Sequence, residues 1–485
     1  MDTVISRTRL APVCLWFLGA SALAAPPQLV GPDPLKILLL DPRVVAHADG
    51  LELRMGAAEK EAANPLIRAD KPWDLYQDTL FPNLVYDASN ALYKVWYMSI
   101  LVDNEQIEKM TPPSRVKNAG NKGFYVSYAQ SRDGLHWEKP LLGVVGYDQQ
   151  DTNVVVHDVM NMGVFLDSHA ADPARRFKMI HGAARIDVHV RFSPDGIRWT
   201  GPIPAKGLEV GGPYVADTHN NAFWDDQLGK YVLFTRMKTD RGRSVAIATS
   251  EDFIHWDRPK LVLKSALEEG TKRQIYSMPV IRYANGYLGF PAMYNAGSDQ
   301  RTNSELAWSS DRVTWHRTLP GTHFIPHGKE LEFDGGIIYV QANPLVLHDG
   351  RMRLYYGGGS AEKPKDWKGV CEIGLAYLRP DGFAGYTVSE GHRSGMLTTN
   401  PLRLTGHAVQ VSADVAERGA LRIEALDDSG KVVARSQWLK RSGTDMPLQW
   451  EDGPGIFDRA GRHVIFRAEL SNATLYAMRG VQVPD

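Results

Sequence analysis

Short runs in which apolar and polar residues alternate fill most of the chain, and turn-forming Gly, Pro, Asn and Asp residues separate them. The pattern is clearest in four runs, at 221–224, 230–235, 244–249 and 261–263. A period of two residues is typical of a β-strand with one buried face. This segment is therefore predicted to form four antiparallel strands connected by hairpins.

A short motif recurs at the end of the third strand of each such unit. Ser-x-Asp-x-x-x-Trp begins at residues 131, 193, 250 and 309, and a fifth copy at 379–385 keeps Asp and Gly but lacks Ser and Trp. A period of 57–70 residues with several strands per unit is typical of a β-propeller, which repeats four-stranded sheets around an axis. We predict an all-β fold with a five-bladed β-propeller. The Asp residues, at 133, 195, 252, 311 and 381, are 62, 57, 59 and 70 residues apart.

The two ends of the chain have different patterns. After residue 386 the alternating runs continue without the motif, which predicts a separate β-sandwich. Near the start, Arg7 and Arg9 precede an apolar run at 10–18 and small residues at 22–24, as in a secretory signal. We predict a signal peptide at 1–24, a propeller at 25–390 and a β-sandwich at 391–485. The protein is expected to be secreted or periplasmic after cleavage near Ala24.

The composition argues against several classes of function. Removing Asp2, Arg7 and Arg9 with the signal leaves 53 of the 55 Lys and Arg and 55 of the 56 Asp and Glu, a balance that favours neither nucleic acid nor anionic lipid. No later run reaches the roughly 18 apolar residues of a membrane-spanning helix. Cys371 is the only cysteine left, so an intrachain disulfide and a cysteine-based metal site are excluded. No ligand spacing indicates a metal, and no cofactor is predicted.

The direction of the strands predicts which face carries the site. Because neighbouring strands are antiparallel, the start of the first strand and the loop between the second and third strands share one face. The Ser-x-Asp motifs follow the third strand and lie on the opposite face. Their Ser and Asp side chains are expected to accept hydrogen bonds from turn amides, and Trp to pack between blades. A site is expected on the axis, and the motif residues Asp133, Asp195, Asp252 and Asp311 are predicted to be structural.

Three carboxylates approach the axial face from different blades, and we predict that Asp78, Asp217 and Asp334 converge there as catalytic residues. Asp217 opens a polar Asp-Thr-His-Asn-Asn run, which is costly at the entry to a buried strand unless its groups are paired or used. Asp78 and Asp334 have turn capping as an equal alternative. The residues expected to contact substrate are Trp73, Asn83, His181, His219, Asn220, Asn221, Arg236, Arg273, Tyr276, Glu305 and Glu332.

The motif resembles that of the five-bladed propeller glycosidases, the superfamily of arabinanases, β-xylosidases, levanases and invertases. Segments 217–225, 307–311 and 355–359 are more closely similar to a group of secreted bacterial proteins related to invertase-type glycosidases. The resemblance implies carboxylates from the first blade, a middle blade and a later blade, and a poly- or oligosaccharide substrate. The Asn-Asp-Pro-Asn, Arg-Asp-Pro and Glu-Cys motifs of invertases are absent, and Cys371 precedes Glu372 in the reverse order.

Cleavage of a glycosidic bond needs an acid for the departing oxygen and a second carboxylate that attacks the anomeric carbon or activates water. The sequence therefore favours a glycoside hydrolase with Asp78 as nucleophile or base, Asp217 as modulator and Asp334 as acid. Large rim loops favour exo attack. Two alternatives stay open: a propeller that binds carbohydrate without cleaving it, and a glycoside phosphorylase. The phosphate pocket of a phosphorylase would use Arg236, Arg241, Arg243 and Arg273.

Overall fold

The computed structural model describes residues 26–74, 81–115, 121–184, 187–208, 216–297, 299–360, 371–451, 453 and 461–484. The predicted signal at 1–24 and the candidate Asp78 lie outside these residues. In the described ranges the helical elements are α1 (Asn104–Glu108) and the 3-10 turn η2 (Pro173–Arg175), and the other regular elements are strands. No helix there has the length and apolar composition needed to cross a bilayer. The fold is all-β, as predicted.

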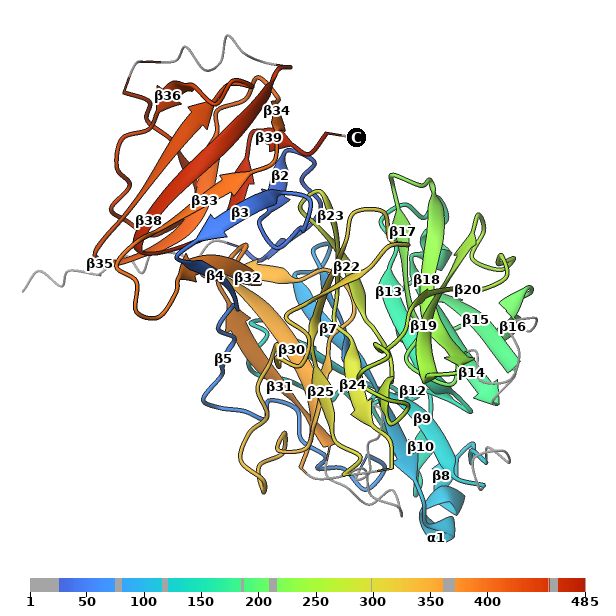
Figure 1. The fold of residues 1–485 in the computed structure, drawn as a ribbon. Coiled ribbons are helices and arrows are strands. Elements are labelled where there is room, and N and C mark those ends of the chain that lie inside the picture. Colours follow the sequence, from blue (N-terminus) through green and yellow to red (C-terminus); the bar gives the residue numbers. More distant parts are fainter. Residues whose placement is uncertain are drawn as a thin grey trace, which may run out of the picture.

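Four antiparallel sheets of four strands follow one another along the chain (Figure 1). The first strand of the second sheet contacts the first strands of its two neighbours. The first sheet contains β6 (Asn83–Asp87), β7 (Leu92–Leu101), β9 (Gly123–Ser131) and β12 (Val154–His157), and the second contains β13 (Met160–Leu166), β14 (Phe177–Ala184), β15 (Asp187–Ser193) and β16 (Ile203–Pro204). The third contains β17 (Asn221–Asp225), β18 (Lys230–Thr239), β19 (Gly242–Ser250) and β20 (Lys260–Leu263), and the fourth contains β22 (Val280–Tyr283), β23 (Gly286–Gly289), β26 (Leu306–Ser309) and β27 (His316–Thr318).

A larger sheet contains the strands expected for a fifth blade. In it β28 (Ile337–Val340) pairs with β30 (Arg351–Gly359), β30 with β31 (Cys371–Leu378), and β31 with β5 (Glu59–Lys60). The start of the chain thus covers an edge strand that would otherwise be exposed. A parallel bridge from Thr302 to Ile337 joins these strands to residues that precede the third strand of the fourth sheet in the chain, so the count of five blades stays a prediction. The same sheet includes β1 (Gln28–Leu29), β21 (Arg273–Ile275), β24 (Ala292–Asn295), β25 (Thr302–Ser304) and β29 (Val346–His348).

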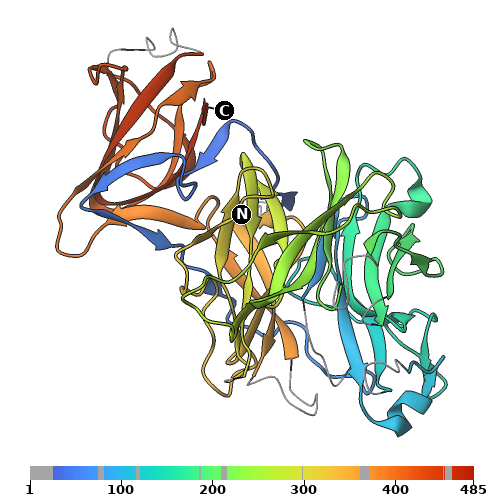
Figure 2. The same cartoon turned by 45° about the vertical axis from the view of Figure 1, so that its right-hand side comes forward.

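Successive side chains of β30 point to opposite faces of its sheet, and each face packs against a neighbouring sheet. Leu354 and Tyr356 are buried on one side with Trp308 of the fourth sheet, and Tyr355 is buried on the other side with Tyr93 of the first. Each such side chain contributes roughly 1.5–3 kcal/mol when removed from water. At the end of the propeller remote from the C-terminal domain, α1 lies beside a small sheet (Figure 2). That sheet is formed by β8 (Met110–Thr111), β10 (Gly146–Tyr147) and β11 (Gln150–Asp151).

The Ser-x-Asp motifs form the turns after the third strands, which confirms their predicted structural role. In each turn the Asp Oδ1 accepts hydrogen bonds of 2.7–2.8 Å from the amides two and three residues later. These are local bonds, formed within five residues of sequence. Trp256 and Trp315, from the third and fourth copies, are buried in the clusters between sheets.

One of these turns predicts a dependence of stability on pH. Burial raises the pKa of Asp252, but hydrogen bonds from the His255 amide and ring and the Ile254 amide outweigh it and lower the value to about 2. Because the folded pKa lies below the unfolded value, the carboxylate stabilises the fold above about pH 4, and this contribution is lost as the pH falls towards 2. Asp252→Asn is expected to cost about 1 kcal/mol or less near neutrality, since the side chain is half exposed. Thermal unfolding at pH 6 and pH 2 checks this; an equal deficit at both values would contradict it.

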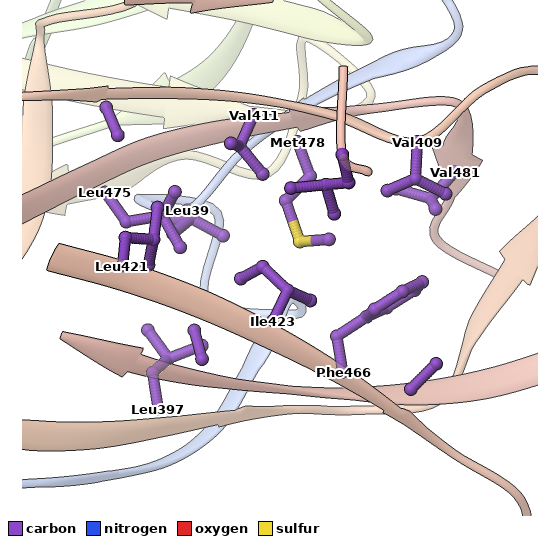
Figure 3. Packing of buried hydrophobic residues seen from close by; sticks show 14 of the residues in the cluster. Leu39, Leu397, Val409, Val411, Leu421, Ile423, Phe466, Leu475, Met478 and Val481 are labelled. Carbon is purple, nitrogen blue, oxygen red and sulfur yellow. The ribbon is translucent and has the colours of Figure 1, made fainter. Parts of the chain in front are cut away.

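The C-terminal β-sandwich takes strands from both ends of the chain (Figure 1). β2 (Lys36–Leu38) pairs with β38 (His463–Arg479), β3 (Val45–Asp49) with β33 (Gly395–Thr399), and β4 (Leu51–Met55) with β32 (Ala384–Val388). The predicted division at residue 390 is corrected accordingly, because these pairings join segments hundreds of residues apart, which a local pattern does not reveal. Figure 3 shows Leu39 from the N-terminal segment among the core residues. The later strands are β32 (Ala384–Val388), β33 (Gly395–Thr399), β34 (Leu402–Leu404), β35 (Gln410–Leu426), β36 (Val432–Arg435), β37 (Gly443–Pro447), β38 (His463–Arg479) and β39 (Val481–Gln482).

The fifth, incomplete copy of the motif joins the two domains. Asp381, which is fully buried, pairs with Lys36 of β2 at 3.0 Å and accepts hydrogen bonds from the hydroxyls of Tyr283 at 2.7 Å and Ser412 at 2.5 Å. Lys36 also pairs with Asp445 at 2.9 Å. Tyr283 belongs to the propeller, whereas Lys36, Ser412 and Asp445 belong to the sandwich. The Asp that caps a local turn in the other copies therefore holds a buried interdomain contact here.

Candidate functional site

The predicted polar residues at the start of the first strands bond to neighbouring sheets. Asn83 Oδ1 accepts a hydrogen bond from the Val164 amide at 2.8 Å and lies 3.1 Å from His219 Nε2. Asn221 Oδ1 accepts one from the Val280 amide at 2.8 Å. The three predicted side chains are at most 2 % exposed. The side-chain oxygens of the two asparagines thus connect the first strands of different sheets.

Asn220 and the ring of His219 are also buried. Asn220 Nδ2 donates to the carbonyl of Asn161 at 2.7 Å, and its Oδ1 accepts from the Thr235 hydroxyl at 2.8 Å. Burial lowers the pKa of His219 to about 3, so the imidazole is neutral near pH 7. The four residues Asn83, His219, Asn220 and Asn221, expected to bind substrate, are engaged in contacts that hold the fold.

Aromatic rings from distant parts of the chain pack together next to His219. The ring centroid of Phe81 lies 4.8 Å from that of His219 and 4.3 Å from that of Tyr339, and Tyr339 lies 5.9 Å from Tyr276. All four side chains are buried, and they come from the segments before β6, before β17 and after β21 and from β28. Beside the buried His219, the described residues therefore form an aromatic cluster.

Asp217 lies at the junction of the third and fourth sheets, where it neutralises a buried cation. Its Oδ2 is 3.1 Å from Arg236 Nη1, and Arg236 Nη2 donates to the Tyr276 carbonyl at 3.0 Å. Burial lowers the pKa of Arg236, and Tyr276 and Asp217 oppose this shift. An unpaired guanidinium in this position would carry a large desolvation cost. The polar run around Asp217 is thus explained by pairing.

Arg273 and Glu305 belong to a second buried ion network. Glu305 is fully buried and lies 3.3 Å from Arg273 and 2.6 Å from Arg317. Arg317 also pairs with Glu269, at 2.5 Å. With no exposed surface, Glu305 is not placed to contact a substrate in this conformation.

Trp73 and His181 are likewise buried and bonded within the protein. Trp73 Nε1 donates to Asn153 Oδ1 at 2.7 Å. His181 Nε2 accepts from Arg191 Nε at 3.1 Å, and burial lowers the pKa of His181 to about 3. Neither side chain lines the cavity that carries the remaining candidates.

A cavity of about 690 Å³ lies beside β30 and β31, between the N-terminal segment 60–68 and the loop 331–334 before β28. Its volume is in the range of small-molecule sites. We call it the rim cavity. Four carboxylate residues and two cationic residues from distant parts of the chain meet there, including the candidates Glu332 and Asp334. It is lined by Lys60, Glu61, Ala62, Asn64, Pro65, Arg68, Leu331, Glu332, Phe333, Asp334, Tyr356, Ser360 and Glu372.

Asp334 lies at the back of the rim cavity. Its Oδ2 is 2.6 Å from Lys60 Nζ and accepts a hydrogen bond from the Tyr356 hydroxyl at 2.7 Å. The sequence predicts that Asp334 faces the axis; in the structure its partners are a lysine from β5 and a tyrosine from β30. The carboxylate lies over β30 because Gly358 leaves room for it: a Cβ on Gly358 would lie 2.6 Å from the Cβ of Asp334. Asp334 is thus paired with the outermost strand of the sheet, away from the first strand.

Glu332 presents an exposed carboxylate next to Asp334. A Cβ added to Gly328 would lie 2.5 Å from Glu332 Oε2 and 2.1 Å from Asp334 Oδ1. The two carboxylate oxygens are therefore no further apart than the sum of these distances, 4.6 Å. Like charges this close repel, and the ammonium of Lys60 offsets part of the repulsion.

Two further carboxyl groups line the rim cavity with pKa values shifted in opposite directions. Burial is the main cause that raises the pKa of Glu372, while the Ala69 amide donates to its Oε1 at 3.3 Å. A hydrogen bond of 2.6 Å from the Tyr377 hydroxyl is the main cause that lowers the pKa of Glu61. Groups whose pKa values are pushed apart in one site are the usual basis for separate acid and base roles.

Sequence reasoning missed Lys60, Glu61 and Glu372. Lys60 and Glu61 give no local signal, because their strand pairs with residues more than 300 positions later. Glu372 had one: it is a carboxylate at the entry of the apolar run 371–378. Among the described residues, no group of three or more His, Cys, Asp or Glu side chains is arranged to hold a metal ion.

No protein-family model matches the sequence, and no curated protein matches it. Similar solved structures include a glycosyl hydrolase from Bacteroides ovatus, at 16% identity over 67% of this chain and 94% of that one, with a TM-score of 0.45. The catalytic domain of a Coprinopsis cinerea GH62 α-L-arabinofuranosidase has 14% identity over 67% and 97%, with a TM-score of 0.44. An N-acetylgalactosamine deacetylase from F. plautii has 14% identity over 68% and 95%, with a TM-score of 0.40. At these identities and TM-scores, the function of this chain has to be argued from its own side chains.

Proposed function

We propose that the protein is a glycoside hydrolase that cleaves a poly- or oligosaccharide in the rim cavity. The observation that carries the proposal is the raised pKa of Glu372 in a cavity that also holds the exposed carboxylate of Glu332. A carboxyl group that keeps its proton and one that is free to act as an anion are the two groups that glycosidic cleavage requires. The resemblance of the repeat motif to propeller glycosidases supports the same reaction.

In the proposed reaction Glu372 gives its proton to the departing glycosidic oxygen as the C–O bond breaks. In one route Glu332 attacks the anomeric carbon, and a water that gives its proton to Glu372 then breaks the bond between Glu332 and the sugar. In the other route Glu332 takes a proton from a water that attacks the anomeric carbon directly; each route consumes one water and leaves a hydroxyl on the released sugar. Asp334 is assigned a positioning role, because its pairing with Lys60 and Tyr356 fixes the wall beside Glu332. These assignments replace Asp217 as modulator and Asp334 as acid.

The test is release of sugar from a panel of arabinan, xylan, fructan and their oligosaccharides, in buffer with and without inorganic phosphate. We expect new reducing ends or free sugar without phosphate, with single terminal units as the first products of an exo-acting enzyme. Binding of a glycan without any bond cleavage across the panel would contradict hydrolysis and favour a carbohydrate-binding propeller. Cleavage that depends on phosphate and yields a sugar phosphate would instead identify a phosphorylase.

A further inference from the structure

A second cavity, of about 560 Å³, lies between the third sheet and strands β21 and β24 of the larger sheet, and it has a basic lining. One wall is the hairpin that connects β18 to β19, and the other is β21 with the residues before it. Lys238, Arg243 and Lys272 line it, and Asp240 is its one carboxylate among the described residues. We call it the basic cavity. It shares no lining residue with the rim cavity.

The guanidinium of Arg243 is held in a fixed position in this cavity. Its Nη1 donates to Gln274 Oε1 at 2.8 Å, and its Cζ lies 5.5 Å and 5.2 Å from the ring centroids of Tyr276 and Tyr294. Gly242 permits this contact, because it has a φ of 79° and an added Cβ would lie 2.4 Å from the Gln274 side chain. A planar cation held by stacking and a hydrogen bond loses little freedom when it binds an anion.

Two of the cations that line the basic cavity, Arg243 and Lys272, have no carboxylate beside them among the described residues. The carboxylate of Asp240 already faces Arg241 at 3.8 Å and Lys264 at 3.5 Å. Within the described residues, neither Arg243 nor Lys272 has a carboxylate within ion-pair distance. Cations that share a concave surface without counter-charges raise the local concentration of anions. The cavity is therefore suited to a negatively charged group.

We propose that the basic cavity binds a carboxylate or sulfate substituent of an acidic glycan, with Arg243 as the main contact and Lys272 as the second. That the ligand is a glycan rests on the proposed function, whereas the binding of an anion does not. Free phosphate as a co-substrate is disfavoured, because a phosphorolytic anion must meet the anomeric carbon beside the acid, and Glu372 lies in the other cavity. Residues close in sequence approach both cavities: Ala296 lines the basic cavity, and Arg301 lies 3.8 Å from Glu330, which precedes Leu331 of the rim cavity.

The test compares binding of three trisaccharides by isothermal titration calorimetry: one built from uronic acids, the same one with its carboxylates reduced to alcohols, and a sulfated one. We expect the charged forms to bind at least tenfold more tightly than the reduced form, and added salt to weaken only the charged forms. Arg243→Gln is expected to remove this preference. Lys272→Gln is expected to reduce the logarithm of the ratio between the two affinities, charged over reduced, by about half. Inorganic sulfate shows whether the anion belongs to a glycan. If sulfate competes with the charged glycan, the site is supported; if sulfate binds but none of the trisaccharides does, the assignment to a glycan is overturned.

Arg198→Gln is the matched control, because Arg198 is three-quarters exposed and contacts only the Asp195 carboxylate in a turn of the second sheet. It should leave all affinities unchanged. Equal affinity for charged and reduced glycans, or an equal loss in the control, overturns the proposal. Thermal unfolding of each variant shows that it is folded. Arg243→Lys provides a variant that keeps the positive charge but lacks the planar guanidinium group. Bond cleavage measured on the same samples keeps the two proposals apart: charge-dependent binding without cleavage contradicts only the hydrolase.

Discussion

Replacing Glu372 by Gln is expected to lower the turnover of a natural glycan at least ~100-fold, the usual scale for losing a positioned general acid. The fold should hold, because burial penalises the charged carboxylate of Glu372 and the neutral amide of Gln removes that penalty. Stability near neutrality is therefore expected to be unchanged or slightly higher. Turnover on the glycan identified in the panel, together with the thermal midpoint, measures both effects.

Glu372→Gln is also expected to change the dependence of the rate on pH. Because burial raises the pKa of Glu372, the group keeps its proton to a higher pH than a free Glu, and the wild-type rate falls as the pH rises through that pKa. Glu372→Gln has no titrating acid, so the decrease at high pH should disappear. An aryl glycoside with a very acidic leaving group needs no proton, and the variant should cleave it at nearly the wild-type rate.

Glu390→Gln is the control, since Glu390 is exposed at the sandwich end of the chain. It should change neither rate nor profile. A Glu372→Gln variant with full activity on the natural glycan would end the assignment of the acid. An equal loss on natural and activated substrates would show that Glu372 acts by binding or shape and not by proton transfer.

Replacing Asp381 by Ala is expected to destabilise the protein by about 3–5 kcal/mol, the range measured when one partner of a buried ion pair is removed. Burial lowers the pKa of Lys36, but Asp381 and Asp445 outweigh it and raise the value, so Lys36 stays charged in the fold. Without Asp381, Lys36 keeps only Asp445, and the hydroxyls of Tyr283 and Ser412 lose their acceptor. Calorimetry should show a lower midpoint and the separation of one transition into two.

The repeat itself supplies the comparison for Asp381→Ala. Asp252→Asn alters the same motif position where it caps only a local turn, and it should cost far less and leave one transition. In the double variant with Lys36→Met, part of the loss should return, because no buried charge is then left unpaired. A single small shift for Asp381→Ala, equal to that of Asp252→Asn, would show that the interdomain pair contributes little.

The two sites differ in what the sequence revealed about them. The basic cavity is formed mainly by residues close in sequence, and the sequence predicts a possible phosphate pocket that includes Arg243, which lines the cavity, and Arg241, which is close to it in sequence. The rim cavity joins the chain start, a loop near residue 332 and the strand that begins at Cys371. Only the arrival of β5 beside β31 places Lys60 against Asp334, 274 residues apart.

The sequence by itself determined the all-β fold and the role of the repeated Asp residues, because a turn such as that of Asp252 is made by hydrogen bonds two and three residues away. It also identified Asp217 as a costly charge at the entry to a buried strand, and it named Glu305 and Asp334 as candidate site residues. Tertiary structure alone decided what each charge faces: Arg236 for Asp217, two arginines for Glu305 and Lys60 for Asp334. The reason is physical, since a buried carboxylate needs compensation from any partner that folding brings near, and that partner leaves no mark in the neighbouring sequence.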